Sequence, residues 1–571
     1  MKGQEMYLRT SKRKNKDGTV VSYYHLAHNV RHSETNVSTP TLIHNFGRTD
    51  QVDRAELVRL CKSIARVCGL EIHDPIEQKQ ESLFPKVGLP KDIELLGCIE
   101  LGTPCLLEAM WEQLGIGPAL RKIFESENRK VPYERALFSM SANRLCEPTS
   151  KLGVWQRWLK KVFLPSCWEL KLEQMYEAME LFYKHSESVE KTVFFEVADL
   201  LNLEVDVVFY DTSTVSFSID ESDEESEEND PINDVLRNLG RSKEGTWTPQ
   251  VVIALAVTKD GIPIRSWVFS GNTSDVTTIE KIKKDLQGWK LGRALFIGDA
   301  GFNSTESRKT LAKACGKYLL ACRMSSVKEI KEEVLSKKGR YTVLAENLHA
   351  KEVVVGEGGV EARRYILCYN PKQSERQSKH REKVVLELEQ KMEEHKDKKA
   401  TAQWAIELKA SGRYGRYLKV TKGGQLKINR GAIRDAARYD GKWVVQTNDD
   451  TLSLENAARS YKALLVIERC FRSLKRSQIQ ISPVFHWTPK RIEAHVKICV
   501  LSLLIERVVE LKCQKPWAQI REELLTLQAT QFQTKLFNFY QRNEPNPGVR
   551  KIFKILGSSL PKKVLEIEER D

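Results

Sequence analysis

The stretch VVFYDTSTVSFS, residues 207–218, sets one carboxylate, Asp211, within a run of apolar, aromatic and β-branched residues. Such a run is typical of a buried strand. A carboxylate buried without a partner is costly, so Asp211 calls for a metal ion, an ion-pair partner or a place at the strand end. The strands around this one therefore decide what Asp211 does.

The sequence after this stretch keeps alternating between strand and helix patterns. Six further elements are predicted in the order strand, strand, helix, strand, helix, strand: 249–258, 263–270, 274–288, 293–299, 304–315 and 317–324. This order is that of an α/β, ribonuclease-H-like fold, in which the first and fourth strands are neighbours. Asp211 and Asp299, which ends the fourth strand in ALFIGDAGFNS, are then expected to lie side by side.

A third acid, Glu468, stands in the helical stretch YKALLVIERCFRSLK, residues 461–475. Tyr461, Glu468 and Lys475 are seven residues apart, about two helical turns, which puts them on one face. A solvated amphipathic surface would show the same spacing. Three rival acids on nearby predicted helices lack this arrangement: Glu455, Glu493 and Glu506.

Together these blocks resemble the three catalytic blocks of the DDE transposases of bacterial insertion sequences. The resemblance is to the group whose third block carries a Y-R-E-K signature, although Leu464 stands here in the Arg position. It extends from about residue 90 to 510. Four other stretches share it: GRSKEGTWTPQ (240–250), SGNTSD (270–275), ARYDGKWVVQTN (437–448) and FHWTPKRIEAHVKICVLSLL (485–504).

The resemblance implies that Asp211, Asp299 and Glu468 are catalytic and hold two Mg²⁺ or Mn²⁺ ions. Two such ions can activate an attacking oxygen and stabilise a leaving oxygen. The implied substrates are double-stranded DNA, both terminal inverted repeats and target, and a homodimer is expected in the synaptic complex. Water would first release a 3′-hydroxyl at the transposon end, and that hydroxyl would then attack target DNA.

The resemblance also implies contacts to the DNA backbone from the helix that carries Glu468. Tyr461 and Lys475 are expected to hold the phosphates beside the cut. Arg469 and Arg472 could replace the Arg missing at Leu464. A further candidate, Lys243, precedes the second strand.

Two alternatives stay open at this point. One is another metal-dependent DNA nuclease or recombinase on the same fold. The other is a domesticated, non-catalytic DNA-binding protein, although the presence of all three acids speaks against it. Binding to inverted repeats, followed by strand transfer, would separate the transposase from both.

The composition favours a polyanionic partner, because 91 Lys and Arg face 77 Asp and Glu among 571 residues, a formal net charge of +14. The acids concentrate in DESDEESEEND, residues 220–230, which is expected to be a solvated loop. Twelve scattered cysteines without a C-x-x-C pair argue against a zinc site. No secretory signal and no apolar run near ~18 residues is found, so a cytoplasmic, nucleoid-associated protein of a bacterium or archaeon is expected.

Six segments are predicted along the chain: a β-hairpin module (1–51), a helical, DNA-binding domain (52–203), the first part of the ribonuclease-H-like core (204–324), a β-rich insertion domain (325–446), the second part of the core with the Glu468 helix (447–513) and a C-terminal helical tail (514–571). Within the helical domain, SKLGVWQRWLKKVFL offers a basic face for DNA: Lys151, Arg157, Lys160 and Lys161.

Overall fold

The computed structural model describes most of the chain. The described residues are 6–15, 20–31, 38–68, 93–127, 132–217, 236–243, 245–356, 362–394, 402–422 and 425–569. The acidic run at 220–230 lies outside them. The chain divides into two compact units, residues 1–93 and 94–571, each of which is described by itself.

The N-terminal unit is a three-stranded antiparallel sheet with one helix. Its strands are β1 (Met6–Lys14), β2 (Val20–Arg31) and β3 (Ser38–Arg48), in that order. Strands β1 and β2 pair as expected of a hairpin, whereas the Asp17–Gly18 turn lies outside the described residues. Helix α1 (Arg54–Val67) follows, and the Asp53 side chain caps it by accepting from the Ala55 amide at 2.8 Å.

The larger unit is mixed α/β and is built on a ten-stranded sheet. Its central part runs β8 (Pro263–Ser270), β7 (Trp247–Val257), β5 (Val207–Ser216), β9 (Leu295–Gly298) and β10 (Lys317–Ala321). Strand β5 pairs antiparallel with β7 and parallel with β9. The prediction that the first and fourth strands are neighbours is therefore confirmed. Strand β6 (Asn238–Arg241) pairs with the start of β7.

Helices cover both faces of this central sheet. One face packs on α9 (Asp275–Gly288) and α10 (Thr305–Ala312). The other packs on α14 (Leu454–Lys462), α15 (Leu465–Arg472) and α16 (Pro489–Cys513). Because side chains alternate along a strand, every residue of β5 is committed to one of these two helical layers.

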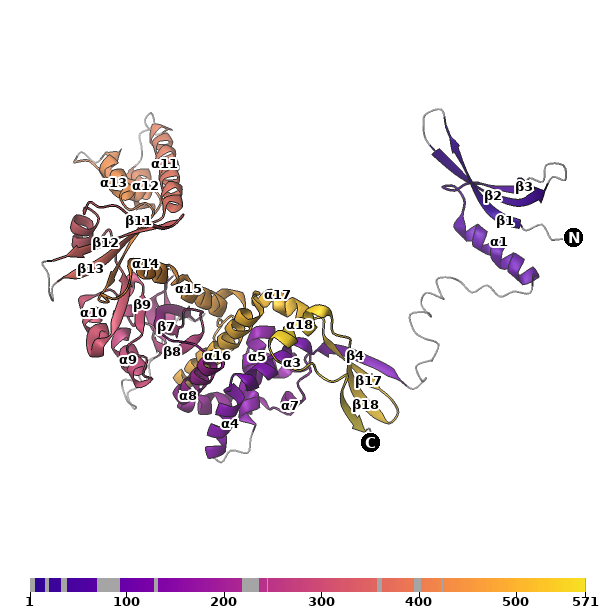
Figure 1. Cartoon of the computed structure of the whole chain (residues 1–571), viewed down its shortest axis with the longest axis horizontal. Coiled ribbons are helices and arrows are strands. Elements are labelled where there is room, and N and C mark those ends of the chain that lie inside the picture. Colours follow the sequence, from indigo (N-terminus) through magenta and orange to yellow (C-terminus); the bar gives the residue numbers. More distant parts are fainter. Residues whose placement is uncertain are drawn as a thin grey trace. The chain divides into compact units, whose positions relative to one another are not determined.

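The segment between β10 and α14 continues the sheet and adds a small helical layer. Strands β16 (Lys442–Thr447), β13 (Arg363–Tyr369), β12 (Leu348–Val355) and β11 (Thr342–Ala345) extend it beyond β10. Figure 1 shows α11 (Pro371–Glu394), α12 (Ala402–Ala410) and α13 (Arg430–Ala437) together at this end. They share their own core with the hairpin of β14 (Leu418–Val420) and β15 (Leu426–Ile428). The segment predicted to be β-rich is thus equally helical.

A helical layer precedes the sheet in the sequence. It comprises α3 (Gly102–Gln113), α4 (Ile116–Ser126), α5 (Tyr133–Cys146), α6 (Lys151–Gly153), α7 (Pro165–Trp168) and the long α8 (Leu172–Leu200). The π-helical turn η1 (Val154–Trp158) continues α6. Helix α8 packs on α16 and on β8, which joins this layer to the sheet. Within the described part of the chain, no helix is long and apolar enough to cross a membrane.

The C-terminal segment is not the helical tail that was predicted. It holds α17 (Trp517–Leu524) and α18 (Pro547–Ile555), but also β17 (Gln528–Gln533), β18 (Phe537–Arg542) and β19 (Val564–Glu569). These strands form a four-stranded sheet with β4 (Glu94–Glu100), in the order β19-β18-β17-β4. Strand β17 pairs with the adjacent β18 and also with β4, which lies more than 400 residues away in the sequence. These pairings give the polar β17 a structure that its own sequence does not predict.

Candidate active site

Asp211 and Asp299 lie at the same edge of two neighbouring parallel strands. In the β5–β9 register Tyr210 is opposite Gly298, so each acid follows one residue later. Asp211 is half-buried and its Oδ1 accepts from the Thr212 amide at 2.7 Å. Asp299 is exposed at the start of the short turn η2 (Ala300–Phe302). The strand order thus brings these two predicted residues together.

The alternation of β5 directs Asp211 toward the helix that carries Glu468. Phe209 and Val215, which share its parity, pack in the core formed with α15 and α16. Ser213 also has this parity, and its hydroxyl accepts from Lys475 Nζ at 3.4 Å. Lys475 lies in η6 (Ser473–Ser477), directly after α15, so it reaches β5 from the same side.

Tyr461 is the residue on which all three predicted acids act. It is half-buried at the end of α14 and packs on the main core. Burial raises the pKa of its phenol, and the negative charges of Asp299, Glu468 and Asp211 raise it further. The three carboxylates therefore act electrostatically on one phenol, although Glu468 itself is exposed on α15.

Burial likewise raises the pKa of Asp211, to about 7. Lys243 opposes this effect, and the charges of Asp299 and Asp275 add to it. Among the described residues, neither Asp211, Asp299 nor Glu468 forms an ion pair with Lys, Arg or His. The site consequently holds an excess of negative charge, which a bound cation would relieve.

The donors suit a hard divalent cation, which prefers oxygen ligands. The acidic side chains stand farther apart than the ligands of an assembled metal site. In the part of the chain that the structure describes, no three His, Cys, Asp or Glu side chains are gathered tightly enough to hold a metal ion. The acids share one electrostatic neighbourhood, and a metal would have to draw them closer together.

A fourth acid, Asp275, was missed as a site residue. It begins α9, and its Oδ1 accepts from the Thr212 hydroxyl at 2.5 Å. Its Oδ2 lies 3.3 Å from Lys243 Nζ, while the Lys243 amide donates to the Thr214 hydroxyl at 3.1 Å. Asp275 thus ties Lys243 to the other face of β5. Its signal was present, because SGNTSD ends on this residue.

The helix around Glu468 is interrupted, whereas one continuous helix was predicted. The turn at Ala463 and Leu464 is tightened to i→i+3 hydrogen bonds, Leu464 N to Tyr461 O at 3.0 Å and Ile467 N to Leu464 O at 3.1 Å. Leu464 packs against the core, which an apolar residue at this bend does better than Arg. Tyr461 and Glu468 thus sit on separate helices.

Arg469 and Arg472 point in different directions. Arg472 follows Glu468 by four residues and shares its side of α15. Arg469 instead lies four residues before Ser473, whose hydroxyl donates to the Glu506 carboxylate. Arg469 lines a pocket with Glu506 and Glu510. Both arginines are exposed. Of the two, Arg472 is the closer to the side of α15 that carries Glu468, and Arg469 is the one that lines the pocket with Glu506 and Glu510.

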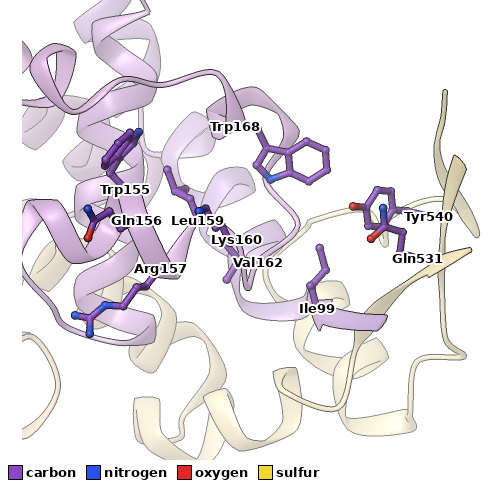
Figure 2. A pocket seen from close by; sticks show the side chains of 10 residues that line it. All are labelled: Ile99, Trp155, Gln156, Arg157, Leu159, Lys160, Val162, Trp168, Gln531 and Tyr540. Carbon is purple, nitrogen blue, oxygen red and sulfur yellow. The ribbon is translucent and has the colours of Figure 1, made fainter. Parts of the chain in front are cut away.

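A basic cavity of about 510 Å³ adjoins the acids on the side of Lys243. Arg241, Lys243 and Arg323 line it together with Asp275 and Trp247, whose side chain is exposed. A second pocket, of about 780 Å³, lies between η1, α7 and the C-terminal sheet. Figure 2 shows Trp168 and Tyr540 on one side of it and Trp155 and Arg157 on the other.

Two family models match the chain. Residues 235–505 match the transposase DDE domain, and residues 8–75 match the N-terminal domain of IS1634 family transposases. Together they account for more than half of the sequence. The chain is a DDE transposase of an insertion sequence. Asp299 and Glu468 fall within the first match, and Asp211 precedes it.

Other comparisons add little. The transposase resembles the solved structure of a piggyBac transposase synaptic complex with hairpin DNA, at 11% sequence identity and a TM-score of 0.32, over 74% of this chain and 79% of that one. A TM-score this low does not establish a common fold. No curated protein matches the sequence.

Proposed function

We propose that the transposase cuts the ends of its element and joins them to target DNA at the site formed by Asp211, Asp299 and Glu468. The observation that carries this proposal is the β5–β9 register, in which Asp211 and Asp299 each follow one of two opposed residues, while Lys475, after the Glu468 helix, reaches Ser213 on the Asp211 face of β5. None of these acids, from β5, from the end of β9 and from α15, forms an ion pair among the described side chains, although the charge of Lys243 acts on Asp211. The strand order supports a ribonuclease-H-like core.

DDE transposases use divalent metal ions. We propose two Mg²⁺ or Mn²⁺ ions here, with Asp211, Asp299 and Glu468 as the ligands. When bound, the ions would lower the pKa of attacking water and neutralise charge on the leaving oxygen. Because a protonated carboxyl group is a poor ligand, the raised pKa of Asp211 means that metal binding must displace a proton at lower pH, so metal affinity is expected to rise with pH.

The reaction consists of two phosphoryl transfers. Water attacks the phosphorus at the transposon end, the bond to the 3′-oxygen breaks, and a 3′-hydroxyl is released. That hydroxyl then attacks a phosphodiester of target DNA, which forms a new bond and releases a target 3′-oxygen. No covalent intermediate with the protein is needed, so the side chains act by holding the phosphates in place.

Backbone phosphates would be held by residues around the acids. Lys475 reaches β5 at Ser213, and Lys243 is held beside Asp211 by Asp275. Tyr461 would donate its hydroxyl to a phosphate oxygen, because its raised pKa keeps it protonated. Arg472 rather than Arg469 would take the role of the Arg absent at Leu464. Membership of the Y-R-E-K group and a synaptic homodimer remain predictions.

The proposal is tested with DNA that carries both ends of the element. Purified wild type is incubated with this DNA and Mg²⁺, beside Asp211→Ala, Asp299→Ala and Glu468→Ala. Each substitution is expected to abolish cleavage and strand transfer while binding of the end DNA persists. Activity in any one variant would remove that residue from the catalytic set. A wild type that binds the ends but never cuts them would favour a domesticated DNA-binding protein.

A further inference from the structure

A cluster of buried cations lies apart from the acids, where α5 and η1 meet α16. Lys151 was expected on an exposed basic face, but its side chain is only 3% exposed. Its Nζ lies 2.8 Å from Nδ1 of His495, and Nε2 of His495 lies 2.9 Å from the Ile481 carbonyl oxygen. Lys151 thus points into the protein, toward a neutral partner.

These residues line a cavity of about 250 Å³ with a one-sided composition. Its basic lining residues are Arg144, Lys151, Arg157, His486 and His495, and none of the described Asp or Glu side chains lines it. A water molecule occupies about 30 Å³ of the liquid, so the cavity could hold about eight waters, enough room for a phosphate group.

Arg144 adds a second buried cation, with 4% of its surface exposed. Its guanidinium donates to backbone carbonyls, at 3.2 Å to Gln480 and also to Thr149. Its Nε is buried without a hydrogen-bond partner among the described atoms. Buried charges are normally paired, and here two of them share one cavity without a carboxylate.

The same protein shows how a compensated lysine is built. Lys497, also about 5% exposed, donates to the Glu190 carboxylate at 2.8 Å. Lys151 lacks such a partner, so burial and the charge of Arg144 lower its pKa to about 7. Burial and the nearby Lys151 also lower the pKa of His486, to about 3. The cavity is therefore short of negative charge.

We propose that this cavity binds a phosphate oxyanion, held by Lys151, Arg144 and Arg157, and that in the working transposase it is a backbone phosphate of DNA. The anion supplies the charge that the protein leaves out, and Lys and Arg are the side chains that bind phosphate most strongly.

The surroundings favour DNA over free phosphate as the source. Arg157 lines both this cavity and the pocket of about 780 Å³, where aromatic side chains lie within reach of the same strand. Figure 2 shows the Arg157 side chain extending away from Trp168 and Tyr540, so it stands between the two spaces. Because Arg157 lines both spaces, a ligand longer than one phosphate could extend from the cavity into the second pocket, as a DNA backbone would.

The first test uses inorganic phosphate, in EDTA at pH 6, where Lys151 is protonated. Thermal unfolding is followed for wild type, Lys151→Met, Arg157→Gln and the exposed control Lys122→Met. Phosphate at about 100 times its Kd is expected to raise the Tm of wild type and control by at least about 2 °C. The rise should vanish in Lys151→Met and shrink in Arg157→Gln, a surface change that leaves folding intact. Equal rises in all four proteins would overturn the proposal.

The second test identifies the source of the phosphate. Binding of end DNA is measured against salt concentration in EDTA, so that no cleavage takes part and failure of the catalytic assignment does not affect the result. The slope of log affinity against log salt is expected to fall by about 0.9 in Lys151→Met, the value for one lost phosphate contact. If Lys151→Met loses the rise in Tm with inorganic phosphate but keeps the wild-type salt slope, DNA is not the ligand and the cavity is a site for a small anion.

Discussion

At the scale of single residues, the ionised form of Asp211 is disfavoured in the folded protein. Asp211 is half-buried, and burial raises its pKa to about 7. Its ordinary pKa, near 3.9, applies in the unfolded chain. The folded protein therefore holds the proton more tightly, and stability contributed by this group falls as pH rises from about 4 to 7. Above pH 7, Asp211 costs stability unless a cation is bound.

Asp211→Asn is accordingly expected to stabilise the metal-free protein. At pH 8 in EDTA, the free energy of unfolding should rise by about 1 kcal/mol or more, the equivalent of at least one pKa unit. The gain should largely disappear at pH 4, where the Asp211 carboxyl group of the folded wild type is protonated and, like the Asn amide, carries no charge. Urea denaturation at the two pH values measures it. The exposed Asp450→Asn serves as control, and a loss of stability at pH 8 in Asp211→Asn would contradict the expectation.

Asp275 acts through its neighbours rather than on DNA. It accepts from the Thr212 hydroxyl and pairs with Lys243, so it fixes a cation beside Asp211. Asp275→Asn keeps the shape but weakens both bonds. The single-turnover cleavage rate at saturating DNA is expected to fall about 10-fold, which corresponds to about 1.4 kcal/mol, with little change in DNA affinity. Ser274→Ala, one residue earlier, should leave the rate unchanged. An equal loss in rate and affinity would instead make Lys243 a simple DNA contact.

At the scale of elements, the bend between α14 and α15 changes which side chains can cooperate. Seven-residue spacing predicts one shared face only for a continuous helix. Here the tight turn at Leu464 intervenes, and η6 alters the pitch before Lys475. Tyr461, Glu468 and Lys475 still act at one place, because the charge of Glu468 raises the pKa of Tyr461 and Lys475 reaches Ser213 of β5.

The same geometry separates the two arginines of α15. Arg472→Gln is expected to lower the slope of log affinity against log salt for end DNA by about 0.9, as one phosphate contact is lost. Arg469→Gln should leave the slope unchanged, because Arg469 faces Glu506 and Glu510. Fluorescence anisotropy over a range of salt concentrations makes the comparison. If Arg469→Gln lowers the slope and Arg472→Gln does not, the assignment on the helix is reversed.

At the scale of the whole molecule, the sequence predicts helices and strands from their local periodicity, but it misses contacts between segments that are far apart in the chain. The order of strands follows from periodicity, and with it the adjacency of Asp211 and Asp299. The C-terminal strands were missed although β17 and β18 form a local hairpin, because the sequence of β17 is polar and its other partner, β4, lies far away in the sequence. Lys151 was misplaced for the same reason, since its partner His495 is 344 residues away. The role of Asp275 could not be predicted from the sequence, because only the fold brings it to Thr212.

Another distant pair joins the helical layer to the catalytic sheet. Glu190 of α8 and Lys497 of α16 are buried and 2.8 Å apart. Both side chains also bond to Ser266 of β8. The Ser266 hydroxyl donates to Glu190 at 2.5 Å, and the Ser266 carbonyl oxygen accepts from Lys497 at 2.5 Å. Two helices and one strand therefore meet at a single ion pair that is closed to water.

Lys497→Met is expected to lower the free energy of unfolding by about 3–5 kcal/mol, because it leaves the Glu190 charge buried without a partner. Glu190→Gln combined with Lys497→Met removes both charges and should recover more than half of that loss. Urea denaturation of the single and double variants measures the coupling. The exposed pair Lys161–Glu147, treated in the same way, should change stability by about 1 kcal/mol at most. If Lys497→Met matched that control, this ion pair would contribute little to the junction, which Arg265 of β8 and Glu187 of α8 also join, at 2.7 Å.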